Sequence, residues 1–159
     1  MKILVVEDDP SQHELIVRVL CREFDMAESD IDVEETEADA REYIDNVSEE
    51  GCPDLCVVDI MLNPWYDGSD EEEDGVAADN AKLIEPEIYL GGFYDAGLRV
   101  IQSIRANRRM RNIPVLVYSV VENSKIEPEV AKLVSRFRCI DKIHGSREFV
   151  RAARELLHR

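Results

Sequence analysis

Five side chains that could bind a metal ion or a phosphoryl group each follow a short apolar run of the chain. They are Glu7, Asp8, Asp59, Ser119 and Lys142. Carboxylates that lie close together raise one another's pKa, and a hard cation such as Mg²⁺, which prefers oxygen ligands, relieves this repulsion. An ammonium group and a hydroxyl beside such a cation can hold phosphoryl oxygens, and an aspartate can itself form an aspartyl phosphate. These residue types therefore indicate phosphoryl chemistry, provided that the fold brings them together.

The apolar pattern of the chain predicts the elements that would bring them together. Runs rich in β-branched residues predict strands at 3–6, 31–33, 55–58, 114–118 and 139–140, and apolar stripes predict helices around 15–20, 40–47, 98–104, 130–137 and 149–157. Strands that alternate with helices form a parallel sheet covered on both faces. The carboxyl ends of such strands lie along one edge, where ligands bind, so we expect the five side chains to meet there.

One segment does not fit this pattern. Residues 63–93 follow the third predicted strand, where a loop usually needs about two to six residues. With nine acidic residues and Lys82 as its only base, the segment carries half of the chain's net charge of −16. We interpret it as an acidic insert within a single domain spanning residues 1–159. The insert would either screen the site from wrong anionic partners or dock a basic one.

Charge, hydropathy and cysteine content narrow the function further. The 159 residues include 19 Lys and Arg against 35 Asp and Glu, which argues against nucleic acid and anionic membrane surfaces as partners. No apolar run approaches the ~20 residues that span a bilayer, and Glu7 comes too early for a signal peptide. The four cysteines, scattered in or beside apolar stretches, favour a reduced, cytoplasmic protein. They are Cys21, Cys52, Cys56 and Cys139.

Taken in order, these motifs resemble the receiver domain of two-component response regulators. The matching pieces are residues 3–10 (ILVVEDDP), 53–62 (PDLCVVDIML), 97–105 (GLRVIQSIR) and 113–119 (IPVLVYS), together with Lys142. They cover the chain except for the insert. The resemblance implies a flavodoxin-like α/β fold, a doubly wound five-stranded parallel sheet in the order 2-1-3-4-5 with five helices. The insert would lie in the loop between the third strand and the third helix.

The resemblance also implies roles for the acidic residues. Asp59 would be the phosphoacceptor, taking a phosphoryl group from a phosphohistidine of a sensor histidine kinase or a histidine phosphotransfer protein. Asp8 and Asp59 would bind Mg²⁺ directly, Glu7 would bind it through water, and the backbone carbonyl of Met61 would be a further ligand. The protein would be an enzyme only in a limited sense, through Mg²⁺-dependent phosphorylation from phosphodonors and self-dephosphorylation.

Two residues would then contact the phosphoryl group and pass the signal on. Ser119 would bond to the transferred group and act as the switch hydroxyl, while Lys142 would pair with the group's charge. The second switch position, three residues before the lysine, is Cys139. Phosphorylation would thereby change contacts with a downstream protein target.

Three positions depart from the family pattern. Val120 replaces a small residue and should crowd the site, while Cys139 replaces an aromatic residue and should weaken the switch coupling. Ile143 replaces a cis-proline after Lys142. A cis bond before a non-proline residue costs ~3–4 kcal/mol, so the Lys142–Ile143 bond is either trans or strained. These departures keep a second hypothesis open, a phosphorylation-independent interaction module that uses the insert as its binding surface.

Met61 and Val121 lie two residues after Asp59 and Ser119 and are apolar. We expect them to flank the phosphoryl group and to slow attack by water, which would give a long-lived phosphorylated form. Met61 also bears on a third hypothesis, a Mg²⁺-dependent phosphohydrolase acting on a small substrate. That hypothesis has little support, because Met61 stands where such an enzyme would carry a second aspartate.

Overall fold

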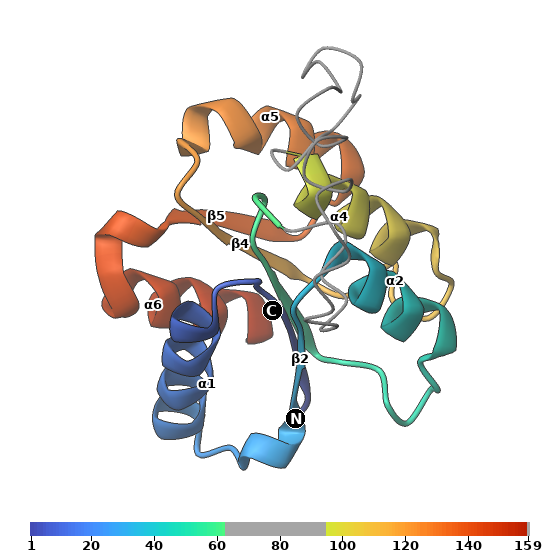
Figure 1. Ribbon diagram of the computed structural model, residues 1–159, viewed down its shortest axis with the longest axis horizontal. Coiled ribbons are helices and arrows are strands. Elements are labelled where there is room, and N and C mark those ends of the chain that lie inside the picture. Colours follow the sequence, from blue (N-terminus) through green and yellow to red (C-terminus); the bar gives the residue numbers. More distant parts are fainter. Residues whose placement is uncertain (63–94, 159) are drawn as a thin grey trace, which may run out of the picture.

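The computed structural model describes residues 1–62 and 95–158, which form a parallel sheet with helices on both faces (Figure 1). The elements are β1 (Ile3–Val6), α1 (Pro10–Phe24), η1 (Glu28–Asp30), β2 (Ile31–Glu34), α2 (Glu37–Asn46), β3 (Leu55–Val58), α4 (Ala96–Ala106), β4 (Val115–Ser119), α5 (Asn123–Leu133), β5 (Phe137–Asp141), η3 (Lys142–His144) and α6 (Gly145–Leu157). The strand order is β2-β1-β3-β4-β5, and all neighbours pair in parallel. The predicted fold class is therefore confirmed. The predicted insert lies outside the described residues.

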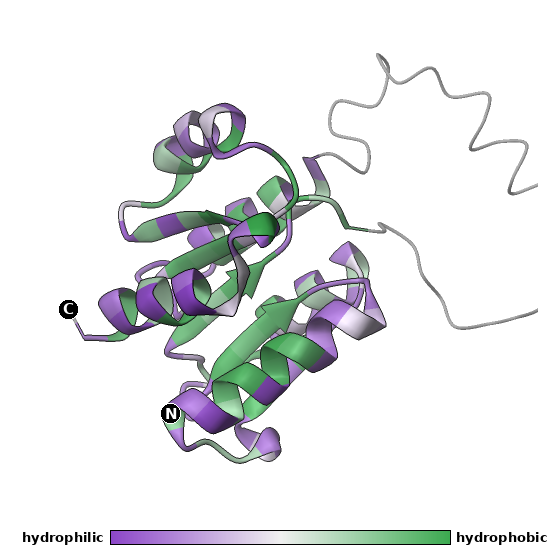
Figure 2. Cartoon of the chain, turned by 90° about the vertical axis from the view of Figure 1, so that its left-hand side faces the viewer, coloured by the Kyte–Doolittle hydropathy of each residue, from purple (hydrophilic) through white to green (hydrophobic). Residues whose placement is uncertain are grey.

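The central strands are buried because both of their faces are covered. Every residue of β1, β3 and β4 is buried, and successive side chains point to opposite faces. Leu4 and Val6 join the core beneath α2, α4 and α5, whereas Ile3 and Val5 join the core beneath α1 and α6. Figure 2 shows mostly hydrophobic residues along the strands and a mixture of hydrophobic and polar residues along the helices. This double cover explains why these strands are continuous apolar runs without alternation.

Two details of the predicted helices are wrong. The apolar stripe predicted a helix through Phe137, but α5 ends at Leu133 and Phe137 begins β5. Val134 and Phe137 pack against the same core as α5, so a turn and a strand reproduce the spacing of a helical stripe. The apolar stripe that predicts the first helix at 15–20 begins with Leu15, which is 41 % exposed and so lies outside the core.

Among the described residues, no helix is both long enough and apolar enough to cross a membrane.

Glu34, at the end of the edge strand β2, offers a test of local charge crowding. Burial raises the pKa of its carboxyl, and the nearby acids Asp39, Asp32 and Glu42 raise it further. An acid whose pKa is raised by folding destabilises the protein when it is ionised, and this cost disappears as the pH falls toward the unfolded-state value. We expect Glu34→Gln to raise the melting temperature at about pH 8 and to lose this advantage near pH 5. A uniform gain, or an equal gain in the exposed-loop control Glu50→Gln, would contradict this account.

Candidate functional site

The end of β1 brings two acidic side chains to the carboxyl edge of the sheet. Glu7 is buried, and its backbone N–H donates to the carbonyl of Glu34 at 3.0 Å, extending the β1–β2 pairing. Asp8 follows and is half-buried. The next residue, Asp9, has a different task, because its carboxylate caps α1 by accepting the N–H of Ser11 at 2.8 Å. This bond and the Ser11 hydroxyl lower the pKa of Asp9. The site therefore uses Glu7 and Asp8, and Asp9 belongs to the helix.

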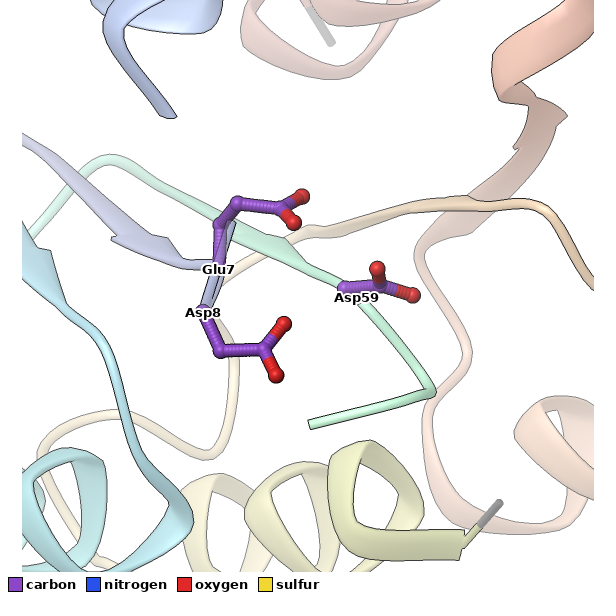
Figure 3. Close-up of side chains that lie close together, drawn as sticks. All are labelled: Glu7, Asp8 and Asp59. Atoms are coloured by element: carbon purple, nitrogen blue, oxygen red, sulfur yellow. The ribbon is translucent and has the colours of Figure 1, made fainter. Parts of the chain in front are cut away.

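The end of β3 places Asp59 beside them. Its backbone N–H donates to the carbonyl of Val6 at 3.0 Å, and its buried carboxylate accepts the N–H of Met61 at 3.1 Å on Oδ1. Glu7, Asp8 and Asp59 each offer a carboxylate oxygen, and these oxygens lie within 4.8 Å of one another. Figure 3 shows the three side chains at the ends of two neighbouring strands.

Lys142 supplies a positive charge between two of these acids. Its Nζ lies 2.7 Å from Asp59 Oδ2 and 2.6 Å from Glu7 Oε2. Burial alone would lower the pKa of Lys142, but the carboxylates of Asp59 and Glu7 outweigh it and raise that pKa. No described peptide bond is cis, so the bond between Lys142 and Ile143 is trans. With this trans bond, the Lys142 side chain contacts both acids.

The cluster holds three carboxylates beside the ammonium group of Lys142. Burial raises the pKa of Glu7 to about 7; the charge of Asp59 adds to this rise and Lys142 opposes it. Although Glu7 Oε2 is close to the lysine, it receives no well-aligned hydrogen bond within the described structure. A cluster of oxygen donors with surplus negative charge is what a hard divalent cation binds. The residues present therefore fit Mg²⁺.

Ser119 ends β4 and is buried at the same edge of the sheet. Its Oγ accepts the N–H of Val121 at 3.3 Å, which folds the following loop back on the strand end. The start of α5 is bonded to β5, because the Asn123 side chain donates to the carbonyl of Cys139 at 3.2 Å. Burial raises the pKa of the Cys139 thiol to about 12, so this cysteine is neutral near pH 7.

The structure corrects the expectation that Val120 crowds the site. Its side chain is 56 % exposed, so it does not fill the space around the carboxylates. Ile143 is likewise 83 % exposed. Side chains alternate along an extended segment, so a buried Ser119 turns its neighbour outward.

One structural requirement of the site was missed from the sequence. Gly97, in the first turn of α4, donates its N–H to the carbonyl of Ile60 at 3.0 Å. A Cβ at this position would overlap the carbonyl oxygen of Asp59 and lie 2.6 Å from Ile60 Cα. The helix therefore rests on the backbone of the candidate phosphoacceptor. The only sequence signal was a glycine at the start of a predicted helix.

Comparisons with known proteins agree at the level of fold. No family model matches the sequence, and no curated protein matches it significantly. Solved receiver domains do match. The signal receiver domain of a DNA-binding response regulator from Colwellia psychrerythraea is 17 % identical with a TM-score of 0.66, over 100 % of this chain and 99 % of the other. The BeF3-activated N-terminal receiver domain of RstA from Klebsiella pneumoniae is 22 % identical with a TM-score of 0.63, over 100 % of both chains.

A third structure is the receiver domain of a sensor histidine kinase from Pseudomonas aeruginosa, with a magnesium ion coordinated in its active-site cleft. It is 17 % identical with a TM-score of 0.63, over 99 % of this chain and 98 % of the other. At these identities the matches establish the fold alone. The chain therefore has the fold of response regulator receiver domains, as its motifs predicted.

The acidic cluster predicts that Mg²⁺ stabilises the protein. A ligand that binds only the folded state adds stability by mass action, so saturating Mg²⁺ should raise the melting temperature by on the order of 5 °C. Asp8→Asn should abolish this rise. Asp9→Asn is the matched control, because asparagine also caps helices and leaves the three clustered carboxylates intact. Equal Mg²⁺ responses in the two variants would show that the ion binds elsewhere.

Proposed function

We propose that this protein is a phosphoacceptor receiver domain of a two-component phosphorelay and that Asp59 accepts the phosphoryl group. The single observation that carries the proposal is the buried contact of Lys142 with Asp59 and Glu7, beside Asp8, at the carboxyl edge of a receiver-type fold. The phosphodonor would be a phosphohistidine on a sensor histidine kinase or a histidine phosphotransfer protein. The magnesium ion in the cleft of the Pseudomonas aeruginosa receiver domain supports a Mg²⁺ requirement.

In the proposed transfer, one bond to phosphorus forms as another breaks. An Asp59 carboxylate oxygen forms a bond to phosphorus while the bond between phosphorus and the histidine nitrogen breaks, and the imidazole keeps the electron pair. The Met61 N–H holds Oδ1 and the Lys142 ammonium holds Oδ2, so the carboxylate is oriented before the donor arrives. Glu7, Asp8, Asp59 and the Met61 carbonyl would hold Mg²⁺, which supplies charge neutralisation for the phosphoryl oxygens.

Once Asp59 is phosphorylated, the surrounding hydrogen bonds must change. The new group adds up to about two negative charges, and Lys142 then pairs with phosphoryl oxygens in place of the carboxylate. The Ser119 hydroxyl turns to donate to the phosphoryl group and so draws the β4–α5 loop toward Asp59. The Asn123–Cys139 bond connects the start of α5, where this loop ends, to β5. The movement would therefore reach the surface of α5 and β5, where a downstream protein target would bind.

The first test is phosphorylation without a kinase. Incubation with Mg²⁺ and acetyl phosphate should give a phosphorylated protein by intact-mass spectrometry, and beryllofluoride should shift the amide resonances of Ser119 and Lys142. Asp59→Asn should abolish both responses. Asp54→Asn is the matched control, because Asp54 precedes β3 at the opposite edge of the sheet, where it accepts the backbone N–H of Lys2 at 2.8 Å. A parent protein that responds to neither reagent would favour the phosphorylation-independent interaction module.

The lifetime of the phosphorylated form is a second test. Met61 and Val121 are partly buried apolar residues two positions after Asp59 and Ser119, so they offer no group that orients a water. Met61→Asn should speed decay of the phosphorylated protein by on the order of tenfold, because an amide can position the attacking water. Met61→Leu, which stays apolar, should decay at the parent rate. If Met61→Asn also keeps the parent rate, this role of Met61 is wrong.

A further inference from the structure

A buried ion pair joins α2 to α4 near the carboxyl edge of the sheet. Glu37, the first residue of α2, is only 5 % exposed. The Nε of Arg99 lies 2.9 and 3.0 Å from its two carboxylate oxygens, and NH2 lies 2.6 Å from Oε2. A guanidinium that reaches both oxygens fixes the direction of the contact as well as its distance. Arg41 also approaches Glu37, at 3.5 Å, but its side chain is mostly exposed.

Arg99 stands two residues after Gly97, in the part of α4 that touches the phosphoacceptor strand. The Gly97 N–H bonds to the Ile60 carbonyl, and no Cβ would fit between Gly97 and the backbone of Asp59. A displacement of the first turn of α4 would therefore move the two peptide units on either side of Ile60, the first of which contains the carbonyl of Asp59. The Glu37–Arg99 pair fixes that turn to α2.

Separate hydrogen bonds join α2 and α4 at the ends far from the site. The Asn107 side chain donates to the carbonyl of Ile44 at 2.6 Å, and the Arg109 guanidinium donates to the carbonyl of Val47 at 3.1 Å. These contacts lie at the far ends of α2 and α4, which run side by side (Figure 1). The ion pair is thus a polar contact between the two helices at the end near the site.

The sequence separates this turn widely from the strand that it touches. A βα loop usually needs about two to six residues, but here residues 63–94 stand between the end of the β3 segment and α4. Among the described residues, the start of α4 is placed by its contacts with the backbone of Asp59 and Ile60 and with α2.

We propose that Glu37 and Arg99 are positioning residues for the phosphoacceptor. They hold the first turn of α4 on the backbone of Asp59 and Ile60, and so set the Asp59 carboxylate against Lys142 and the Mg²⁺-binding acids. Neither residue belongs to the acidic cluster, and both act through Gly97. The inference rests on the proposed function for its effect on phosphorylation, but not for its effect on the geometry of Asp59.

The test compares Arg99→Gln with the matched control Arg41→Gln, which removes the exposed partner of the same glutamate. Arg99→Gln should shift the backbone amide resonances of Asp59 and Ile60 and lower the rate of phosphorylation by acetyl phosphate by on the order of tenfold, because small misplacements of a reacting group are costly. Arg41→Gln should leave both readouts at parent values. If Arg99→Gln fails to fold, Arg99→Lys replaces it, since lysine keeps the charge and loses the two-point contact.

The outcomes separate the two proposals. Amide resonances and a phosphorylation rate that stay at parent values in a folded Arg99 variant would overturn the positioning role. Equal effects in the Arg99 and Arg41 variants would overturn it as well, because general loss of charge around Glu37 would then explain them. A parent protein that cannot be phosphorylated, combined with shifted Asp59 and Ile60 amides in Arg99→Gln, would sink the proposed function and support the positioning contact.

Discussion

The structure depends on keeping three carboxylates together at the edge of a buried sheet. Charges taken out of water are costly unless they are paired and hydrogen-bonded. Lys142 offsets part of this free-energy cost, because its ammonium contacts both Asp59 and Glu7. The parallel sheet makes the contact possible, because it brings the carboxyl ends of β1, β3 and the turn after β5 to one edge. Glu7 Oε2 has no well-aligned hydrogen bond among the described residues, and a cluster of acidic oxygens of this kind fits Mg²⁺.

The long connection between β3 and α4 adds a second constraint. Among the described residues, contacts of α4 with the β3 segment and with α2 orient this helix. Gly97 rests on the backbone of Asp59, and the pair of Glu37 and Arg99 holds the same turn against α2. The candidate phosphoacceptor is therefore fixed from two sides, by the strand that carries it and by a helix that returns from a distant part of the chain.

The departures from the receiver pattern affect the surface more than the site. Val120 and Ile143 are both exposed, and the trans bond after Lys142 still places the ammonium on Asp59. Cys139 is the substitution that matters inside the fold, because a partly buried thiol replaces a ring beside the β4–α5 loop. The groups that the proposed phosphoryl transfer requires are thus present together, while the aromatic ring of the receiver pattern is absent at Cys139.

The sequence alone determined the strands, most of the helices and the edge at which Glu7, Asp8, Asp59, Ser119 and Lys142 are gathered. Apolar periodicity is a local property that the sequence displays directly. Because the carboxyl ends of parallel strands lie at one edge of the sheet, the residues that follow each predicted strand could be assigned to one site. Local spacing also misled, since Phe137 continues a helical stripe while belonging to β5. Only the tertiary structure decided that Val120 faces solvent, that Gly97 lies on Asp59 and that Glu37 pairs with Arg99. The last two residues lie 62 positions apart, and their contact exists because α2 and α4 pack together, which no local pattern encodes.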